Sequence, residues 1–159
     1  MPNFSYRDGT LWCDGVDVPR LMREHGSPLY IYSSEAIIER CREIDRACGD
    51  ARHLVYYAVK ANANLEILKL LAAQGLGADV GSGGELYLAL KAGFKPSSIT
   101  FSGVGKRDDE IAQALDAGIL AFNIESRQEV DAIEAVAAAR GATARVLLRV
   151  NLDIDAGGH

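Results

Sequence analysis

The sequence predicts an α/β fold, namely a partial (β/α)₈ TIM barrel of about five β/α units, preceded by short β-strands. Short apolar runs alternate with segments of helical periodicity, and each helical segment is followed by a glycine, a common helix terminator. No G-x-G-x-x-G motif follows the first apolar run, which disfavours an open dinucleotide-binding sheet. A complete barrel needs about 250 residues. The chain of 159 residues therefore predicts the first part of a barrel.

Residues 1–32 are predicted to be rich in β-structure. Residues 6–12 carry an Asp-Gly turn signal between short apolar pieces, which is typical of a hairpin. Residues 20–25 predict a short helix that ends at Gly26, and residues 28–32 predict a strand. Because this part has no evident core of its own, we expect it to pack on another part of the protein.

From residue 33 onward the pattern changes to alternating helices and strands. Serine or asparagine begins several of the helices as an N-cap. The run 54–59 is continuously apolar, β-branched or aromatic, which is typical of a parallel strand buried on both faces. In chain order the expected helices are 33–48, 64–74, 82–92, 108–117 and 126–140, and the expected strands are 54–59, 78–80, 99–101, 120–124 and 144–150.

Composition and charge are those of a soluble globular protein. Hydrophobic residues make up 48% and charged residues 25%, and the net charge is −5. This acidic balance leaves no basic footprint for nucleic acid or for an anionic membrane, so we expect neither partner. No run approaches the ~20 apolar residues of a membrane span, and the first residues lack a secretory signal. We therefore expect a cytoplasmic protein.

The three cysteines are expected to be small buried or half-buried thiols. They form no Cys-x-x-Cys pair, and the spacing of Cys41 and Cys48 is too long for a disulfide within one helix. We therefore expect no metal site and no redox site from these residues.

Lys60 is the residue that most clearly suggests chemistry. It directly follows the apolar run 54–59, at the carboxyl end of a strand, where parallel α/β folds place their catalytic groups. A lysine held there by rigid backbone and partly desolvated has an amine that is free to attack an aldehyde. The alternative is a lysine whose aliphatic stem carries its charge out to solvent, and the position alone leaves both interpretations open.

Five segments resemble, in order and spacing, the motifs of the fold-type III pyridoxal-phosphate-dependent amino-acid decarboxylases. The first, Tyr57 to Asn62, is similar to the motif that carries the cofactor lysine. The others are similar to the segments at the ends of the second to fifth barrel strands, namely 77–86, 101–106, 122–126 and 148–151. The resemblance covers essentially the whole chain. Within the superfamily it is closest to the diaminopimelate decarboxylases.

The resemblance implies a two-domain lyase that uses pyridoxal 5′-phosphate. Residues 1–32 would supply strands of a β-sandwich domain, and residues 33–159 would form the first part of the cofactor-binding barrel. The complete enzyme would be a homodimer acting on a small-molecule substrate in lysine biosynthesis, with decarboxylation of meso-2,6-diaminopimelate to L-lysine and carbon dioxide. The protonated ring of the pyridoxal phosphate would act as the electron sink for that reaction.

Three residues carry over from the family to the site. Lys60 would hold the cofactor as a Schiff base and is the predicted catalytic residue. Asp79 would lie in the wall of the active site, although a helix-preceding cap is an equal alternative. Arg149 would lie near the phenolic oxygen of the ring, and its apolar neighbours in the run 146–150 disfavour a surface ion pair. Ser102 is predicted to be either part of this site or only a turn residue.

Two departures from the family pattern affect the expected activity. Leu152 replaces a proline that is common in the family, which is a mild loop change. The family's phosphate loop, the acid that protonates the ring and the stacking histidine would all follow residue 159, so His159 is not assigned that last role. We therefore expect this chain alone to be inactive, with the open edges of its first and fifth strands favouring association. The alternative is a non-catalytic pyridoxal-phosphate-binding protein or a pseudo-enzyme partner of the same superfamily.

Overall fold

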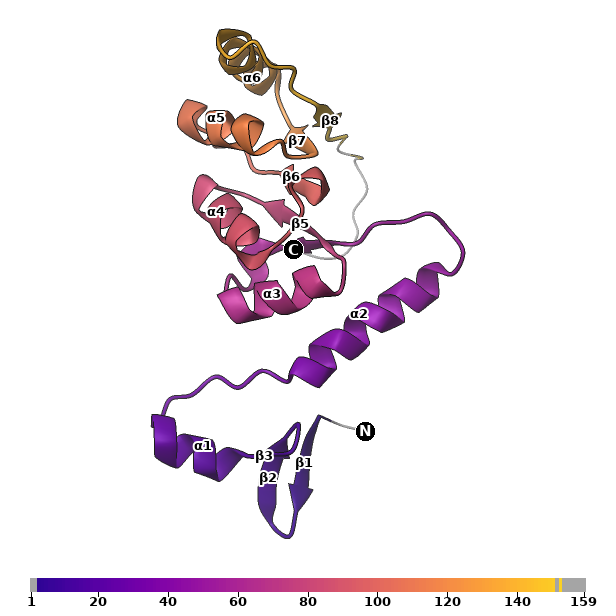
Figure 1. The fold of residues 1–159 in the computed structure, drawn as a ribbon, viewed down its shortest axis with the longest axis vertical. Helices are drawn as coiled ribbons and strands as arrows, with labels where there is room; N and C mark the ends of the chain where they lie inside the picture. The colour runs from indigo at the N-terminus through magenta and orange to yellow at the C-terminus, as the bar shows by residue number, and fades with distance from the viewer. Residues whose placement is uncertain (1–2, 151, 153–159) are drawn as a thin grey trace. The chain divides into compact units, whose positions relative to one another are not determined.

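The computed structural model describes residues 3–150 and 152. It divides into two compact units, Met1–His53 and Leu54–His159 (Figure 1). The family resemblance suggests a domain division at residue 32/33 instead, and that division remains a proposal. None of the helices in the described part of the chain is long and apolar enough to cross a bilayer.

The first unit contains a small antiparallel sheet followed by two helices. The sheet has the order β1 (Phe4–Arg7), β2 (Thr10–Cys13), β3 (Val16–Asp17), and the helices are α1 (Val18–His25) and α2 (Ser34–Cys48). Arg7 pairs with Thr10 across a two-residue turn, Asp8-Gly9, in which both residues have positive φ. Such a turn matches the twist of the strands it joins, and the predicted hairpin is confirmed.

The strand expected at residues 28–32 is not formed. This segment has no regular secondary structure, and Tyr30 is 85% exposed. An apolar, β-branched run becomes a strand only when a neighbouring strand pairs with it. No such neighbour exists among the described residues, since the small sheet consists of β1, β2 and β3 only.

Asp14 connects the small sheet to the start of α2 within the first unit. Its carboxylate accepts hydrogen bonds from Ser33 Oγ at 2.7 Å and from the backbone N–H of Glu35 at 3.2 Å. Burial alone would raise the pKa of the Asp14 carboxyl, but these hydrogen bonds hold it below its ordinary value. The N-terminus of α2 is thus satisfied by a residue far from it in sequence as well as by its own cap, Ser33.

The second unit is a five-stranded parallel sheet with helices along one side of it. The strands lie in chain order, β4 (Tyr56–Ala58), β5 (Gly77–Val80), β6 (Ile99–Phe101), β7 (Ala121–Ile124) and β8 (Val146–Leu148). The helices are α3 (Leu65–Ala73), α4 (Gly83–Ala92), α5 (Asp108–Ala117) and α6 (Arg127–Ala139), with short 3₁₀ turns η1 (Val59–Ala61) and η2 (Pro96–Ser98). Figure 1 shows α3 to α6 stacked along the strands. An unreversed strand order is that of a barrel wall, so the predicted fold class is confirmed.

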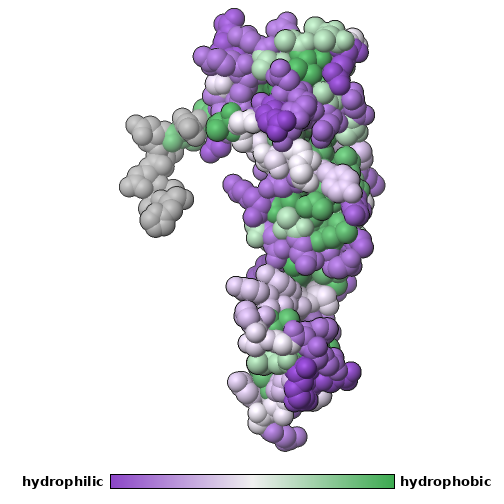
Figure 2. All heavy atoms as spheres, turned by 90° about the vertical axis from the view of Figure 1, so that its left-hand side faces the viewer, coloured by the Kyte–Doolittle hydropathy of each residue, from purple (hydrophilic) through white to green (hydrophobic). Residues whose placement is uncertain are grey.

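The core of this unit lies between the sheet and its helices. Alternate strand residues point into it because side chains along a strand alternate between the two faces. Phe101 and Phe122 are almost fully buried, and their rings stack with centroids 6.1 Å apart. The helices contribute Leu68, Leu86 and Ile111 from the other side. The outward helix surfaces are mostly hydrophilic, as the purple colour in Figure 2 shows.

β8 differs from the prediction of a buried strand over residues 144–150. Only Val146–Leu148 form the strand, and all three residues are exposed, Leu148 to 72%. β8 is the last strand of the described sheet and pairs with β7 alone. The sequence pattern records that these side chains are apolar, but it does not reveal whether a further element covers them.

Gly77 shows how closely the strands of the second unit pack. A Cβ at this position would lie 2.7 Å from the Ser98 carbonyl oxygen and 2.7 Å from ring atoms of Tyr56. We expect Gly77→Ala to lower the free energy of unfolding by about 1–3 kcal/mol, because backbone on one side leaves little room to relax. Chemical denaturation measures the change. Gly105→Ala is the matched control, since a Cβ there meets nothing within 4 Å. An equal effect of both substitutions would contradict the packing argument.

Candidate functional site

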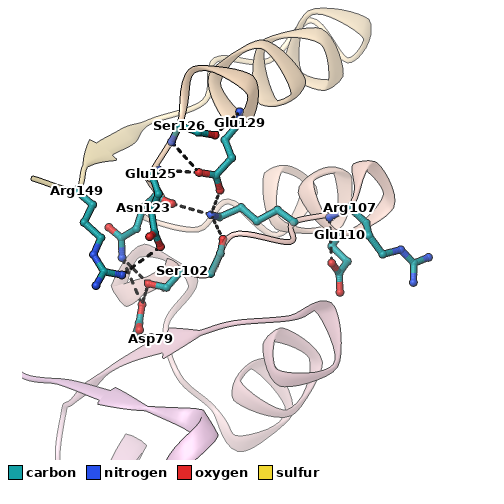
Figure 3. Close-up of polar contacts among 11 residues, drawn as sticks. Asp79, Ser102, Arg107, Glu110, Asn123, Glu125, Ser126, Glu129 and Arg149 are labelled. Atoms are coloured by element: carbon teal, nitrogen blue, oxygen red, sulfur yellow. Dashed lines mark hydrogen bonds and ion pairs between the residues drawn. The ribbon is translucent and has the colours of Figure 1, made fainter. Parts of the chain in front are cut away.

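Polar side chains gather at the carboxyl ends of β5, β6 and β7, on the sheet face opposite to the buried phenylalanines. Asp79 Oδ1 accepts hydrogen bonds from Thr100 Oγ1 at 2.8 Å and from Ser102 Oγ at 2.5 Å. Asn123 Nδ2 donates to Ser102 Oγ at 2.7 Å and, at 3.5 Å, to Asp79 Oδ1 (Figure 3). We call Asp79, Thr100, Ser102 and Asn123 the edge cluster. Ser102 therefore belongs to the edge cluster, and its part in a functional site stays a prediction.

Lys60 lies at the same edge of the sheet as the edge cluster. Ala58 of β4 pairs with Asp79 of β5 in parallel register, and Lys60 follows two residues later in η1. Its side chain is exposed and forms no hydrogen bond or ion pair with the described residues. The partly desolvated environment expected from the sequence is therefore absent, because β4 is the first strand of the sheet and has one neighbour. What remains is a primary amine that no residue in the described part of the chain binds.

Hydrogen bonds on both sides of Lys60 hold its backbone in place. The Tyr57 hydroxyl, three residues before it, donates to the carbonyl oxygen of Asn62, two residues after it, at 3.2 Å. Asn62 Oδ1 accepts from the N–H of Asn64 at 2.9 Å, and Asn64 caps α3. The turn that carries Lys60 is thus tied to β4 before it and to a helix after it.

Arg149 follows β8 at the same edge and forms an ion pair. Its Nη1 lies 3.2 Å from Glu125 Oε1, and its side chain is 59% exposed (Figure 3). The sequence interpretation disfavoured such a surface pair because the flanking run is apolar. That interpretation is wrong for this chain, since Val146 and Leu148 are exposed on the edge strand β8 and Val150, which follows that strand, is exposed as well.

A buried ion pair behind the edge cluster is not predicted by the sequence. The side chain of Lys106 is 1% exposed, and its Nζ donates to Glu129 Oε1 at 2.8 Å, to the Gly103 carbonyl at 2.6 Å and to the Asn123 carbonyl at 2.7 Å. In the sequence, Lys106 is distinguished only as the last residue of a family motif. The signal that could have found its partner is the Ser-x-x-Glu capping box at 126–129, which places Glu129 beside the end of a strand.

Glu129 also accepts hydrogen bonds from backbone at the start of α6. Its Oε2 accepts from the N–H of Glu125 at 2.7 Å and of Ser126 at 3.1 Å (Figure 3). Burial alone would raise the pKa of the Glu129 carboxyl, but the hydrogen bond from Lys106, these backbone donors and the Lys106 charge hold it below its ordinary value. Glu129 is therefore ionised at neutral pH and balances the buried ammonium.

The same position carries a glutamate in three successive helices. The third residue of α4, α5 and α6 is Glu85, Glu110 and Glu129 respectively. Glu85 accepts from the N–H of Gly81, whereas Glu110 accepts from the N–H of Gly83, at the start of the preceding helix α4, at 2.7 Å. Glu129 likewise accepts from Lys106, in the loop that precedes α5. Successive loops at the carboxyl edge are therefore linked by helix-capping carboxylates.

Comparison with known proteins identifies the family. The sequence model described as "Pyridoxal-dependent decarboxylase, pyridoxal binding domain" matches residues 34–159. The chain belongs to the pyridoxal-dependent decarboxylase family. The family's cofactor and its lyase class are those that the sequence predicted, and both predictions are confirmed. Of the family motifs, Asn151 lies outside the described residues, as does His159.

Similar decarboxylases of this family are matched over nearly the whole chain. Diaminopimelate decarboxylase of Aquifex aeolicus is 49% identical over 99% of this chain and 37% of that protein. The Pseudomonas aeruginosa enzyme of that name is 45% identical over 100% of this chain and 38% of that protein. The crystal structure of the M. jannaschii diaminopimelate decarboxylase with L-lysine has a TM-score of 0.89 and 38% identity over 97% of this chain and 37% of that one. The chain thus spans less than two fifths of the length of these relatives.

The residues at the carboxyl edge fit the reactive end of a pyridoxal group. An aldehyde requires a free amine, and Lys60 provides one in a turn held by backbone contacts. Polar ring substituents require oriented donors and acceptors, which the edge cluster offers. Asp79 Oδ2 accepts no hydrogen bond from the described residues, so this oxygen is available to a ligand.

The pKa of Glu129 predicts how stability depends on pH. A carboxyl whose pKa is lower in the folded state contributes stability above its unfolded pKa of about 4.3, and this contribution is lost as the pH falls through the folded pKa. We expect the unfolding free energy of the wild type to exceed that of Glu129→Gln most at pH 7, and the difference to shrink below about pH 4. Denaturant unfolding from pH 7 to pH 3 measures it. Glu66→Gln, which alters an exposed ion pair with Lys69, is the control and should change little. A difference that is independent of pH would contradict the assignment.

Proposed function

We propose that this chain is the part of a diaminopimelate decarboxylase that carries the cofactor lysine, Lys60. The complete enzyme would convert meso-2,6-diaminopimelate to L-lysine and carbon dioxide. The observation that carries the proposal is the exposed Lys60 amine at the carboxyl edge, beside the edge cluster, where none of the described residues binds it. The choice of substrate is supported by the relatives at 43–49% identity, which bear that enzyme name.

Each residue at the edge has a definite task in this proposal. Lys60 binds the cofactor covalently through its amine and is the catalytic residue. When bound, the pyridoxal ring withdraws electrons from the carbon that loses carbon dioxide. Asp79, oriented by the hydroxyls of Thr100 and Ser102, would offer its carboxylate to the bound group. Arg149, oriented by Glu125, supplies a positive charge at the same edge.

We further propose that the complete enzyme is a cytoplasmic homodimer. The acidic net charge of −5 is compatible with a small-molecule enzyme that binds neither nucleic acid nor anionic membrane. The homodimer is what the resemblance to the family implies. The exposed apolar residues Val146, Leu147 and Leu148 of β8 would favour association of this chain by itself, because the further strands of a complete barrel would cover that edge.

Covalent trapping tests the assignment of Lys60. We expect pyridoxal phosphate to form an adduct that borohydride makes permanent, and peptide mass spectrometry to locate it on Lys60. Lys60→Ala should lose this adduct because no other amine occupies that position. Lys69→Ala is the matched control, since Lys69 lies on the exposed surface of α3. If Lys60→Ala retains the trapped adduct at wild-type yield, the assignment is wrong.

A turnover assay tests whether the 159-residue chain is sufficient for the reaction. We expect no measurable release of carbon dioxide from meso-2,6-diaminopimelate, because the relatives that carry the activity extend well beyond the matched 37–38% of their length. Adduct formation on Lys60 should still occur, since it needs only the free amine and the turn that holds it. Turnover by the purified chain at a rate near that of a complete relative would contradict this expectation.

A further inference from the structure

The buried charge of Lys106 is satisfied entirely by one carboxylate and two backbone carbonyls. An ammonium has three protons to donate, and the three acceptors are Glu129 Oε1 and the carbonyls of Gly103 and Asn123. The side chains of Lys106 and Glu129 are 1% and 11% exposed. Burying charges carries a large desolvation cost, and replacing such a pair by apolar residues is often neutral or stabilising. A contribution to stability is therefore a weak explanation for the presence of a buried ion pair here.

The two carbonyls that Lys106 holds belong to the backbone beside the edge cluster. Asn123 is itself a member of that cluster, and Gly103 directly follows another member, Ser102. The side chains of Ser102 and Asn123 hydrogen-bond to each other at 2.7 Å and both donate to Asp79 Oδ1. A shift of either strand end would break these contacts, because hydrogen bonds weaken steeply with distance and angle.

We infer that Lys106 is a positioning residue, whose ammonium, neutralised by Glu129, fixes the carboxyl ends of β6 and β7 so that Ser102 and Asn123 face Asp79. The inference rests on the proposed function, since it is the cofactor face of the site that is positioned. Glu129 has two roles in this arrangement. One carboxylate oxygen neutralises Lys106, and the other holds the backbone N–H groups of Glu125 and Ser126 at the end of β7.

Two variants separate positioning from stability. Lys106→Met removes the three donated hydrogen bonds and leaves the Glu129 carboxylate buried without its partner, so it should also unfold more easily. The double variant K106M/E129Q removes both charges and keeps acceptors for the N–H groups at the start of α6. Its melting temperature should recover most of what Lys106→Met loses. Lys69→Met is the matched control, because it breaks an exposed pair with the same 2.8 Å separation.

Amide hydrogen exchange, detected by NMR, measures the order of the strand ends without any cofactor. The reporters are the N–H groups of Ser102 and Arg149, which bond to the carbonyls of Val80 and Ile124 and touch neither Lys106 nor Glu129. We expect both to exchange at least about tenfold faster in K106M/E129Q, since the lost bonds come from a charged donor. The Leu120 N–H, bonded to Ile99 at the opposite end of the sheet, is the internal reference and should be unchanged.

The rate of adduct formation on Lys60 is the second readout, and it should fall in K106M/E129Q even where the melting temperature recovers. If K106M/E129Q shows wild-type exchange rates and a wild-type rate of adduct formation as well as a recovered melting temperature, the inference is overturned, because the pair would then only stabilise the fold. Unchanged exchange in both variants would overturn it as well. If the wild type forms no adduct on Lys60, the proposed function fails, and faster exchange at Ser102 and Arg149 still supports the positioning role.

Discussion

The carboxyl edge of the sheet depends on one buried charge. Lys106 lies almost out of solvent, and each of its three protons meets an acceptor supplied by a different segment of the chain. A charge in such a place is tolerated only when it is neutralised and fully hydrogen-bonded. The loop after β6, the end of β7 and the start of α6 are therefore held in one arrangement. Wherever one of them moves, the ammonium loses a partner.

The glutamates at the third position of α4, α5 and α6 extend this constraint along the sheet. Glu110 and Glu129 accept from the N–H of the residue that caps their own helix, and Glu85 accepts from the N–H of Gly81, just before the cap of α4. Glu110 and Glu129 also accept hydrogen bonds from the preceding β/α segment, from Gly83 and Lys106 respectively. Each of these carboxylates therefore both caps its own helix and aligns the neighbouring segment. Parallel strands joined in this way end at a common edge. That edge is where the edge cluster and Lys60 lie.

Lys60 and Lys106 show that two lysines in different surroundings can have different roles. Lys106 is buried and bound on all sides, so its amine cannot react. Lys60 is exposed and unengaged by the described residues, while its backbone is held through Tyr57 and Asn62. A nucleophile needs this combination of a free amine and a fixed position. The edge cluster complements it, because its internal hydrogen bonds leave Asp79 Oδ2 free for a ligand.

Local patterns in the sequence predicted most of the secondary structure and singled out Lys60, whose role as the cofactor lysine is a proposal. The Asp8-Gly9 hairpin, the helix caps at Asn64 and Ser126, and the alternation of β4 to β8 with their helices all depend on residues a few positions apart. Periodicity, capping and turn chemistry act over such short separations. The family motif around Lys60 is equally local, because it lies within six consecutive residues, 57–62, and the order of residues alone is enough to identify it.

Contacts between distant residues were decided only by the tertiary structure. The bond from Ser102 to Asp79 spans 23 residues, as does the pair of Lys106 with Glu129. The capping box marks Glu129 in the sequence, but neither contact follows from the separation of its two residues along the chain. The segment 28–32 and β8 have strand-like sequences, yet one forms no strand and the other is exposed. The sequence by itself determined which residues are apolar, which begin helices and which lysine follows β4, the first strand of the parallel sheet. Whether a strand is paired, an apolar residue covered or a charge neutralised depends on neighbours that the folded chain alone brings together.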